Sequence, residues 1–92
     1  MIRSFRHKGL RTLFETGRRT KLPPQDTERI ENVLFLLDQA RGPEDVNLPG
    51  LRLHALKGDW KGQWAVTVRA NSRIVFRFEG GDVWDVDIVD YH

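Results

Sequence analysis

The order of apolar and polar positions divides the chain into a helix-forming first half and a strand-forming second half. In residues 8–16 apolar side chains recur at helical spacing, and Gly17 follows as a stop signal. Residues 25–41 have one apolar face, with most polar residues on the other, which predicts a second helix. The apolar positions of that helix are Ile30, Val33, Leu34, Leu37 and Ala40.

Beyond "EDVNLPG" the period changes from helical to alternating, which predicts strands. The short connections "KGDWKG", "RANS" and "EGGD" indicate that successive strands pair as an antiparallel meander. Residues 2–5 form a further short strand candidate that should join the sheet. The residues expected to face the helices are Leu51, Leu53, Ala55, Trp64, Val66, Val68, Ile74, Phe76, Phe78, Trp84, Val86 and Ile88.

The predicted fold class is therefore α+β, in one domain over residues 1–92. Two N-terminal helices should pack on one face of a small, twisted, mainly antiparallel sheet of about four to five strands. The alternate positions of the strands then face outward and are rich in cations. They are Arg52, His54, Thr67, Arg69, Arg73, Arg77, Asp85 and Asp87.

The composition excludes several classes of protein. The chain has no cysteine, so disulfides and thiolate metal sites are excluded. No apolar run approaches the length of a membrane span, and the basic N-terminus lacks the apolar core of a signal peptide. We expect a cytoplasmic protein that needs no cofactor. A metal site of His54, Asp90 and His92 is conceivable, but the spacing matches no compact ligand motif, so we expect none.

The net charge of +2 conceals alternating blocks of charge. Residues 1–21 contain seven Lys and Arg against one acid, and residues 52–77 contain six against one. Residues 79–92 contain five acids and no base. Two separate basic blocks favour a polyanionic partner, whereas a solvated surface with salt bridges between the blocks is the alternative interpretation.

Four residues could carry proton-transfer chemistry: His54, Asp90, Tyr91 and His92. Two imidazoles, a phenol and a carboxylate among cations would suit general acid–base catalysis on a phosphodiester. Asp90 could equally pair with an arginine, Tyr91 could be a core aromatic residue, and His92 could be a frayed terminus. The residues alone leave these alternatives open.

The connections also carry candidate RNA-binding residues. Trp60 lies in "KGDWKG" between Lys57 and Lys61, where it could cover the end of the core or stack on a base or a partner surface. In "RANSR", Arg69 and Arg73 flank a turn with Asn71 at its tip. This arrangement could be turn chemistry alone, or a pair of phosphate contacts with a polar group that reads a base edge.

As a whole the chain resembles a HigB-type toxin of the RelE/ParE toxin–antitoxin superfamily. The resemblance rests on "MIRSFRHKGLRTLFETG", "LRLHALKGDWKGQWAVTVRANSRIVFRF" and "VDIVDYH". It implies a ribosome-dependent endoribonuclease that cuts messenger RNA in the ribosomal A site by attack of the 2′-OH on its own 3′ phosphate. It also implies a helix-turn-helix antitoxin, a 70S ribosome and messenger RNA as partners, with DNA contacted only through the antitoxin complex.

The resemblance assigns catalysis to His54, Asp90, Tyr91 and His92, and RNA contacts to Lys57, Asn71 and Arg73, to which the turn argument adds Arg69. Two other functions stay open: a ParE-like inhibitor of DNA gyrase, which would make the histidines incidental, and a non-catalytic RNA- or protein-binding module. Growth arrest and message cleavage, assayed for wild type and for His54→Ala, Tyr91→Ala and His92→Ala, distinguish all three.

Overall fold

The computed structural model describes residues 1–19 and 22–90. The first helix, α1 (Lys8–Thr16), begins after His7, whose ring Nδ1 accepts a hydrogen bond from the Leu10 N–H at 3.2 Å. It ends at Gly17, which has φ +78° and donates its N–H to the Leu13 carbonyl. A left-handed residue after a helix is the usual role of glycine, so the predicted bounds of this helix are confirmed.

The second helix, α2 (Thr27–Gln39), is shorter than the sequence pattern predicts. Residues Pro24–Asp26 form a separate 3₁₀ turn, η1, and Ala40 is already extended. Because proline cannot donate a backbone hydrogen bond, it favours this tight turn at the entrance to the helix. Ile30, Leu34 and Leu37 are buried on the inner face of α2, as the apolar spacing predicts.

Within the described residues the sheet has four strands in the order β1-β2-β3-β4, with every neighbouring pair antiparallel. The strands are β1 (His54–Ala55), β2 (Trp64–Arg69), β3 (Ser72–Glu79) and β4 (Asp82–Asp90). The N-terminal segment runs parallel to β4 through single bridges at Ile2–Val83 and Phe5–Val86. The segment joins the sheet as expected, but through isolated bridges and not as a regular strand.

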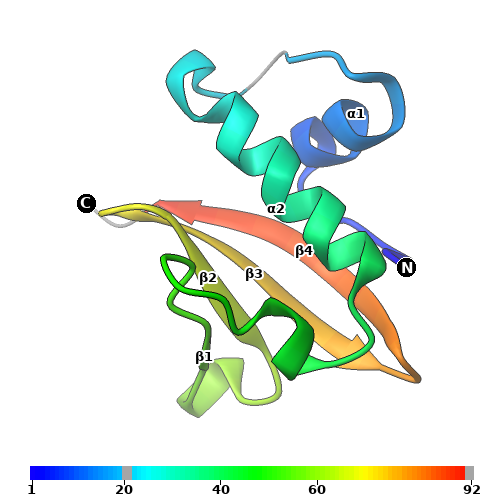
Figure 1. Ribbon diagram of the computed structural model, residues 1–92, viewed down its shortest axis with the longest axis vertical. Coiled ribbons are helices and arrows are strands. Elements are labelled where there is room, and N and C mark those ends of the chain that lie inside the picture. Colours follow the sequence, from blue (N-terminus) through cyan, green and yellow to red (C-terminus); the bar gives the residue numbers. More distant parts are fainter. Residues whose placement is uncertain (20–21, 91–92) are drawn as a thin grey trace.

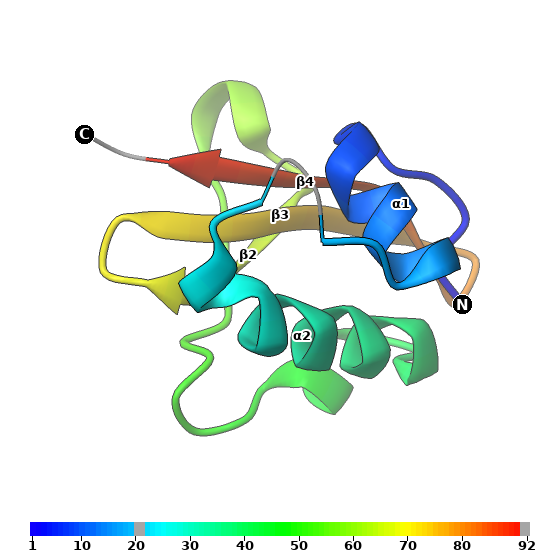
Figure 2. The same ribbon diagram turned by 90° about the horizontal axis from the view of Figure 1, so that it is seen from above.

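Both helices lie over the same face of the sheet (Figure 1). Two more 3₁₀ turns, η2 (Pro43–Val46) and η3 (Gly58–Trp60), belong to the connections before and after β1. Figure 2 shows η3 on the side of the sheet away from α2. The predicted α+β architecture is therefore confirmed. Among the described residues no helix is long and apolar enough to cross a membrane.

The core lies between α1, α2 and the inner face of the sheet. Phe76 and Ile74 from β3 are fully buried against Leu10 of α1 and Leu34 of α2. Burial of one such side chain contributes about 1.5–3 kcal/mol. The strand alternation predicts this inner set correctly for β2 and β3.

The predicted strand over residues 51–56 is reduced to two residues. Gly50 and Arg52 both have positive φ, at +89° and +51°, so the backbone bends before β1 begins. Ala55 is exposed and does not join the core. The alternation failed here because a left-handed arginine leaves no signal in the sequence.

Trp84 was expected beside Val86 in the core, and this expectation was wrong. The register shifts between Val75 and Arg77, and Asp85 takes φ +57° as the extra residue of a β-bulge. The bulge moves Trp84 to the outer side, where it pairs with Arg77, and the Arg77 guanidinium lies 5.4 Å from the centre of the indole ring. Val83 occupies the core in its place.

Asp85 ties the bulge to the N-terminal segment. Its carboxylate accepts hydrogen bonds from Arg77 Nε at 2.8 Å and from Ser4 Oγ at 3.2 Å, and its own N–H donates to Ser4 Oγ at 2.8 Å. The hydrogen bond from Arg77 lowers the pKa of Asp85. The charged form therefore stabilises the fold at neutral pH.

Replacement of Asp85 by asparagine should lower the free energy of unfolding at neutral pH, because it removes the charge while it keeps a side chain that tolerates positive φ. The difference in the free energy of unfolding between this variant and wild type should shrink as the pH falls below about 4. It should vanish below the lower pKa of Asp85 in the native protein, because the wild-type carboxylate is then neutral as well. Urea unfolding at several pH values measures this difference.

Asp85→Val serves as the comparison. A β-branched residue in the left-handed region should cost about 1–2 kcal/mol more than asparagine. Equal stability of the two variants would contradict the strained bulge.

Candidate functional site

The face of the sheet away from the helices, called the open face here, contains the Arg77–Trp84 pair and two further rows of side chains. One row is His54, Ala65, Val75 and Asp87, and the next is Thr67, Arg73 and Val89. Ala65 and Val75 are 0% and 1% exposed, yet they lie outside the cluster that packs on the helices. The centre of the open face is therefore apolar and buried. The His54 imidazole lies at one edge of it and the Asp87 carboxylate at the other.

His54 is an exposed residue of β1 whose ring has a fixed hydrogen bond. Its Nδ1 lies 3.0 Å from the Arg52 carbonyl oxygen. Because a carbonyl can only accept, Nδ1 must carry the proton, and the neutral ring then presents its Nε2 lone pair. The positive φ of Arg52 belongs to the bend that brings this carbonyl back to the ring. His54 is thus oriented as a proton acceptor.

Three cations accompany His54 at this edge of the sheet. Arg52, Lys57 and Lys61 are all exposed, and none forms an ion pair with another described residue. Their charges are available to an anionic partner, as the basic block in the sequence suggested.

A second group of predicted residues gathers at the turn between β2 and β3. Asn71 is exposed in this turn, and Arg73 Nη1 donates to the carbonyls of Arg69, Ala70 and Ser72 at 2.8–3.2 Å. Asp90 pairs with Ser72 in the sheet and therefore ends β4 beside the same turn. The structure thus brings Asn71, Arg73 and Asp90 to one end of the sheet.

Arg69 does not lie on the outer side, and that expectation was wrong. The register shifts between Thr67 and Arg69, so that Arg69 pairs with Ser72 on the side of the helices. There its Nε lies 3.4 Å from the carboxylate of Asp26, a buried residue before α2. A bulge at Val68 reverses the alternation, and no residue in "TVRAN" signals it.

The described residues do not bring His54 and Asp90 into contact. Across the sheet, His54 on β1 and Asp90 on β4 are separated by three strand spacings of about 4.8 Å. Along β4, Asp90 lies three residue steps of about 3.4 Å beyond Asp87, which shares a row with His54. Strand alternation also directs Asp90 to the side of Ile88, which packs against the core. Tyr91 and His92, the other two predicted catalytic residues, lie outside the described residues. Their roles, and that of Asp90, remain predictions.

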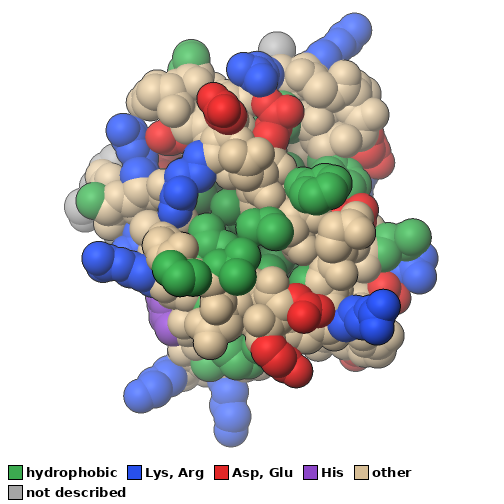
Figure 3. All heavy atoms as spheres, in the orientation of Figure 1, with side chains coloured by type: hydrophobic (Ala, Val, Ile, Leu, Met, Phe, Trp, Pro, Cys, Tyr) green, Lys and Arg blue, Asp and Glu red, His purple; other side chains and the backbone are tan. Residues whose placement is uncertain are grey.

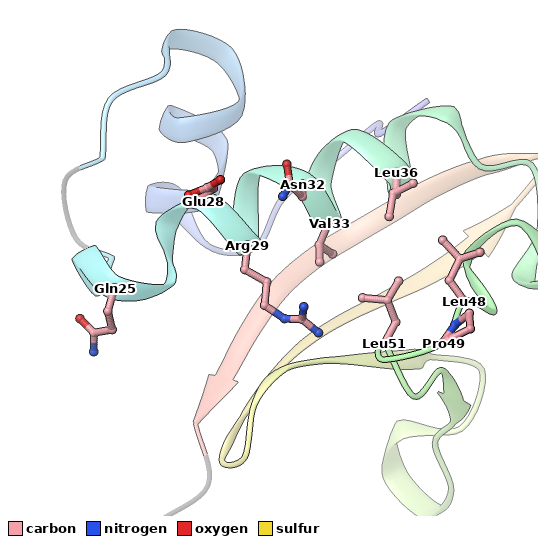
Figure 4. A pocket seen from close by; sticks show the side chains of 9 residues that line it. All are labelled: Gln25, Glu28, Arg29, Asn32, Val33, Leu36, Leu48, Pro49 and Leu51. Carbon is pink, nitrogen blue, oxygen red and sulfur yellow. The ribbon is translucent and has the colours of Figure 1, made fainter.

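A separate hollow of about 440 Å³ lies between α2 and residues 48–51. Figure 3 shows hydrophobic side chains gathered in the middle of this face. Arg29 reaches across it (Figure 4) and donates to the carbonyls of Gly50 and Thr67 at 3.0 and 3.1 Å. Arg29 therefore stabilises the bend before β1. The residues that line the hollow include no histidine. In the described part of the chain no three His, Cys, Asp or Glu residues are placed to hold a metal ion.

Solved structures share this fold. The YoeB–YefM complex from Staphylococcus aureus matches with a TM-score of 0.64 at 14% identity, covering 100% of this chain and 95% of that one. A YafQ mutant from E. coli matches with a TM-score of 0.61 at 13% identity, covering 98% and 91%. At these identities the likeness defines the class of fold.

Sequence comparison defines the family. The Proteus vulgaris protein named Endoribonuclease HigB is 47% identical over 92 residues, which is all of both chains. Toxin HigB-1 of Vibrio cholerae serotype O1 is 33% identical over 86 residues, or 88% of this chain and 87% of that one. Residues 3–92 match the family description, and the chain belongs to the RelE-like toxins of the type II toxin–antitoxin system HigB.

The neutral ring of His54 should carry its proton on Nδ1, because that atom faces a carbonyl. His7 provides an internal control with the opposite tautomer. Its Nδ1 accepts a hydrogen bond from a backbone N–H, so the proton of its neutral ring must lie on Nε2. Nitrogen-15 chemical shifts of the ring atoms at a pH where both rings are neutral measure the two tautomers. The same tautomer at both residues would contradict this geometry.

Proposed function

We propose that this toxin is an endoribonuclease that cuts messenger RNA in the A site of the 70S ribosome. The observation that carries the proposal is the oriented imidazole of His54, an exposed residue at a cationic edge of the open face. The 47% identical relative from Proteus vulgaris is named an endoribonuclease, which supports the reaction class.

In the proposed reaction the ribose 2′-OH loses its proton to a base as its oxygen attacks the adjacent phosphorus. The bond from phosphorus to the 5′ oxygen breaks, and that oxygen takes a proton from an acid. The products are a 2′,3′-cyclic phosphate and a 5′-OH. Neutral His54 can accept a proton at Nε2, and protonated His54 can donate one there. Its counterpart would come from Tyr91 or His92, and Asp90 would orient the neighbouring imidazole.

Charge on the phosphate would be stabilised by cations of the same face. Lys57 lies three residues beyond His54, and Arg73 occupies the neighbouring row of the open face. Asn71, exposed in the β2–β3 turn, could contact a base or the backbone. Arg69 is also proposed to contact RNA, although its Nε lies 3.4 Å from the carboxylate of Asp26.

The wide spread of the described groups supports the proposed dependence on the ribosome. His54 and Asp90 lie on strands at opposite edges of the sheet, so the protein alone constrains flexible RNA weakly. A message held by the ribosome in a reactive shape lowers that entropic cost. The partners would be the ribosome, its message and a helix-turn-helix antitoxin, with DNA bound only through the antitoxin, all in the cytoplasm.

His54→Ala should reduce the rate of message cleavage on programmed ribosomes by about 10²–10⁴-fold, the usual contribution of a general acid or base. The thermal midpoint should stay close to that of wild type, because the side chain is exposed and its hydrogen bond goes to a neighbouring carbonyl. Single-turnover cleavage and thermal unfolding measure the two effects.

Asn32→Ala, at an exposed position of α2 on the far side of the sheet, is the control and should cleave like wild type. The proposal is wrong if His54→Ala retains full activity, or if wild type cleaves free message as fast as ribosome-bound message. Growth arrest with intact message would instead favour a target other than RNA.

A further inference from the structure

The connection between β1 and β2, residues 57–63, is called the Trp60 loop here. Its indole is 42% exposed, whereas the other two tryptophans are half-buried. Trp64 packs against the core, and Trp84 donates its indole N–H to the Glu79 carbonyl and lies against Arg77. Trp60 is thus the most exposed of the three tryptophans.

The loop is held in one shape by its own backbone. The Leu56 N–H donates to the Gln63 carbonyl at 2.9 Å and closes the base of the loop. Inside it, Trp60 donates to Lys57, Lys61 to Gly58, and Gln63 to Trp60, at 3.0–3.3 Å between each N and O. The two bends fall at Gly58 and Gly62, where φ is +65° and +95°. A ring on such a support loses little entropy when it binds.

The position and charge of the loop point to its partner. The loop begins three residues after His54 and lies on the side of the sheet away from α2 (Figure 2). Lys57 and Lys61 flank the exposed ring without ion pairs in the described chain, against one exposed acid, Asp59. An aromatic ring between cations suits an unpaired base and its neighbouring phosphates.

We propose that Trp60 stacks on a base of the RNA substrate, while Lys61 joins Lys57 in contacting the phosphates on either side. The inference rests on the proposed function and adds to it a binding residue outside the catalytic group. Every base has a π-face, so the contact holds RNA without reading its sequence. An indole moves no proton, so Trp60 affects binding and leaves the chemical step to other groups.

The first test compares substitutions of Trp60 on programmed ribosomes. Trp60→Ala should raise KM roughly tenfold and leave kcat within about twofold of wild type, since stacking on one base has about this effect. Trp60→Tyr should retain most of the affinity, whereas Trp60→Leu, which keeps apolar bulk without a π-face, should behave like alanine. Phe35→Ala, which removes a 65% exposed ring from α2, is the matched control and should leave KM unchanged.

Several results would overturn the inference. They are an unchanged KM in Trp60→Ala, leucine performing as well as tyrosine, or an equal loss in Phe35→Ala. A loss of antitoxin affinity in Trp60→Ala, with KM unchanged, would also overturn it, because the loop would then serve the protein partner.

A second measurement does not depend on cleavage. A short unstructured oligouridylate added to His54→Ala should quench tryptophan fluorescence, and the same RNA should quench far less when Trp60→Phe is added to that variant. Equal quenching in both proteins would overturn the inference. If wild type fails to cut any message while this difference persists, the proposed function falls and the stacking site stands.

Discussion

The antiparallel ladder between β3 and β4 fixes the position of nearly every other element. It contains seven register pairs, from Ser72–Asp90 to Glu79–Asp82. One face of the ladder supplies the buried side chains on which both helices pack, and the outer edge of β4 receives the N-terminal segment. The other edge of β3 pairs with β2 and, through it, positions β1. Since side chains alternate along a strand, a slip of one residue would exchange core and surface.

The candidate site depends on this ladder unequally. Asp90 and the turn with Asn71 and Arg73 lie directly at its end. His54 is attached through β1, which has only two register pairs with β2, and the bend before it is held by the two hydrogen bonds of Arg29. Backbone hydrogen bonds from the Thr67 N–H to the Leu51 carbonyl and from the Leu56 N–H to the Gln63 carbonyl complete the attachment of this edge.

The sequence predicts the regular parts of this structure well. Apolar periodicity and Gly17 predict α1, and strand alternation with short connections predicts the order of the sheet. The misses in the sheet share one cause, namely local backbone with positive φ or an extra residue. Arg52, Asp85 and the bulge before Arg69 each reset the alternation, and non-glycine residues in these conformations leave no pattern. The orienting role of the Arg52 carbonyl could not be predicted for the same reason.

Residue types alone identified His54 and the basic blocks, and the family resemblance supplied the reaction. The structure adds the tautomer of His54 and the closed support of Trp60, because both depend on hydrogen bonds to backbone carbonyls. Such hydrogen bonds depend on the path of the backbone, and the residue types give little indication of them. Asp90 was found from sequence as a candidate, but its pairing with Ser72 required the register.

The central claim, cleavage by attack of the 2′-OH, is tested most directly by the chemistry of the new RNA ends. Message on ribosomes would be cut in water enriched in oxygen-18, and the fragments analysed by mass spectrometry. The account predicts a 2′,3′-cyclic phosphate that contains no solvent oxygen, together with a 5′-OH. A 3′-OH paired with a 5′-phosphate that carries oxygen-18 would contradict it.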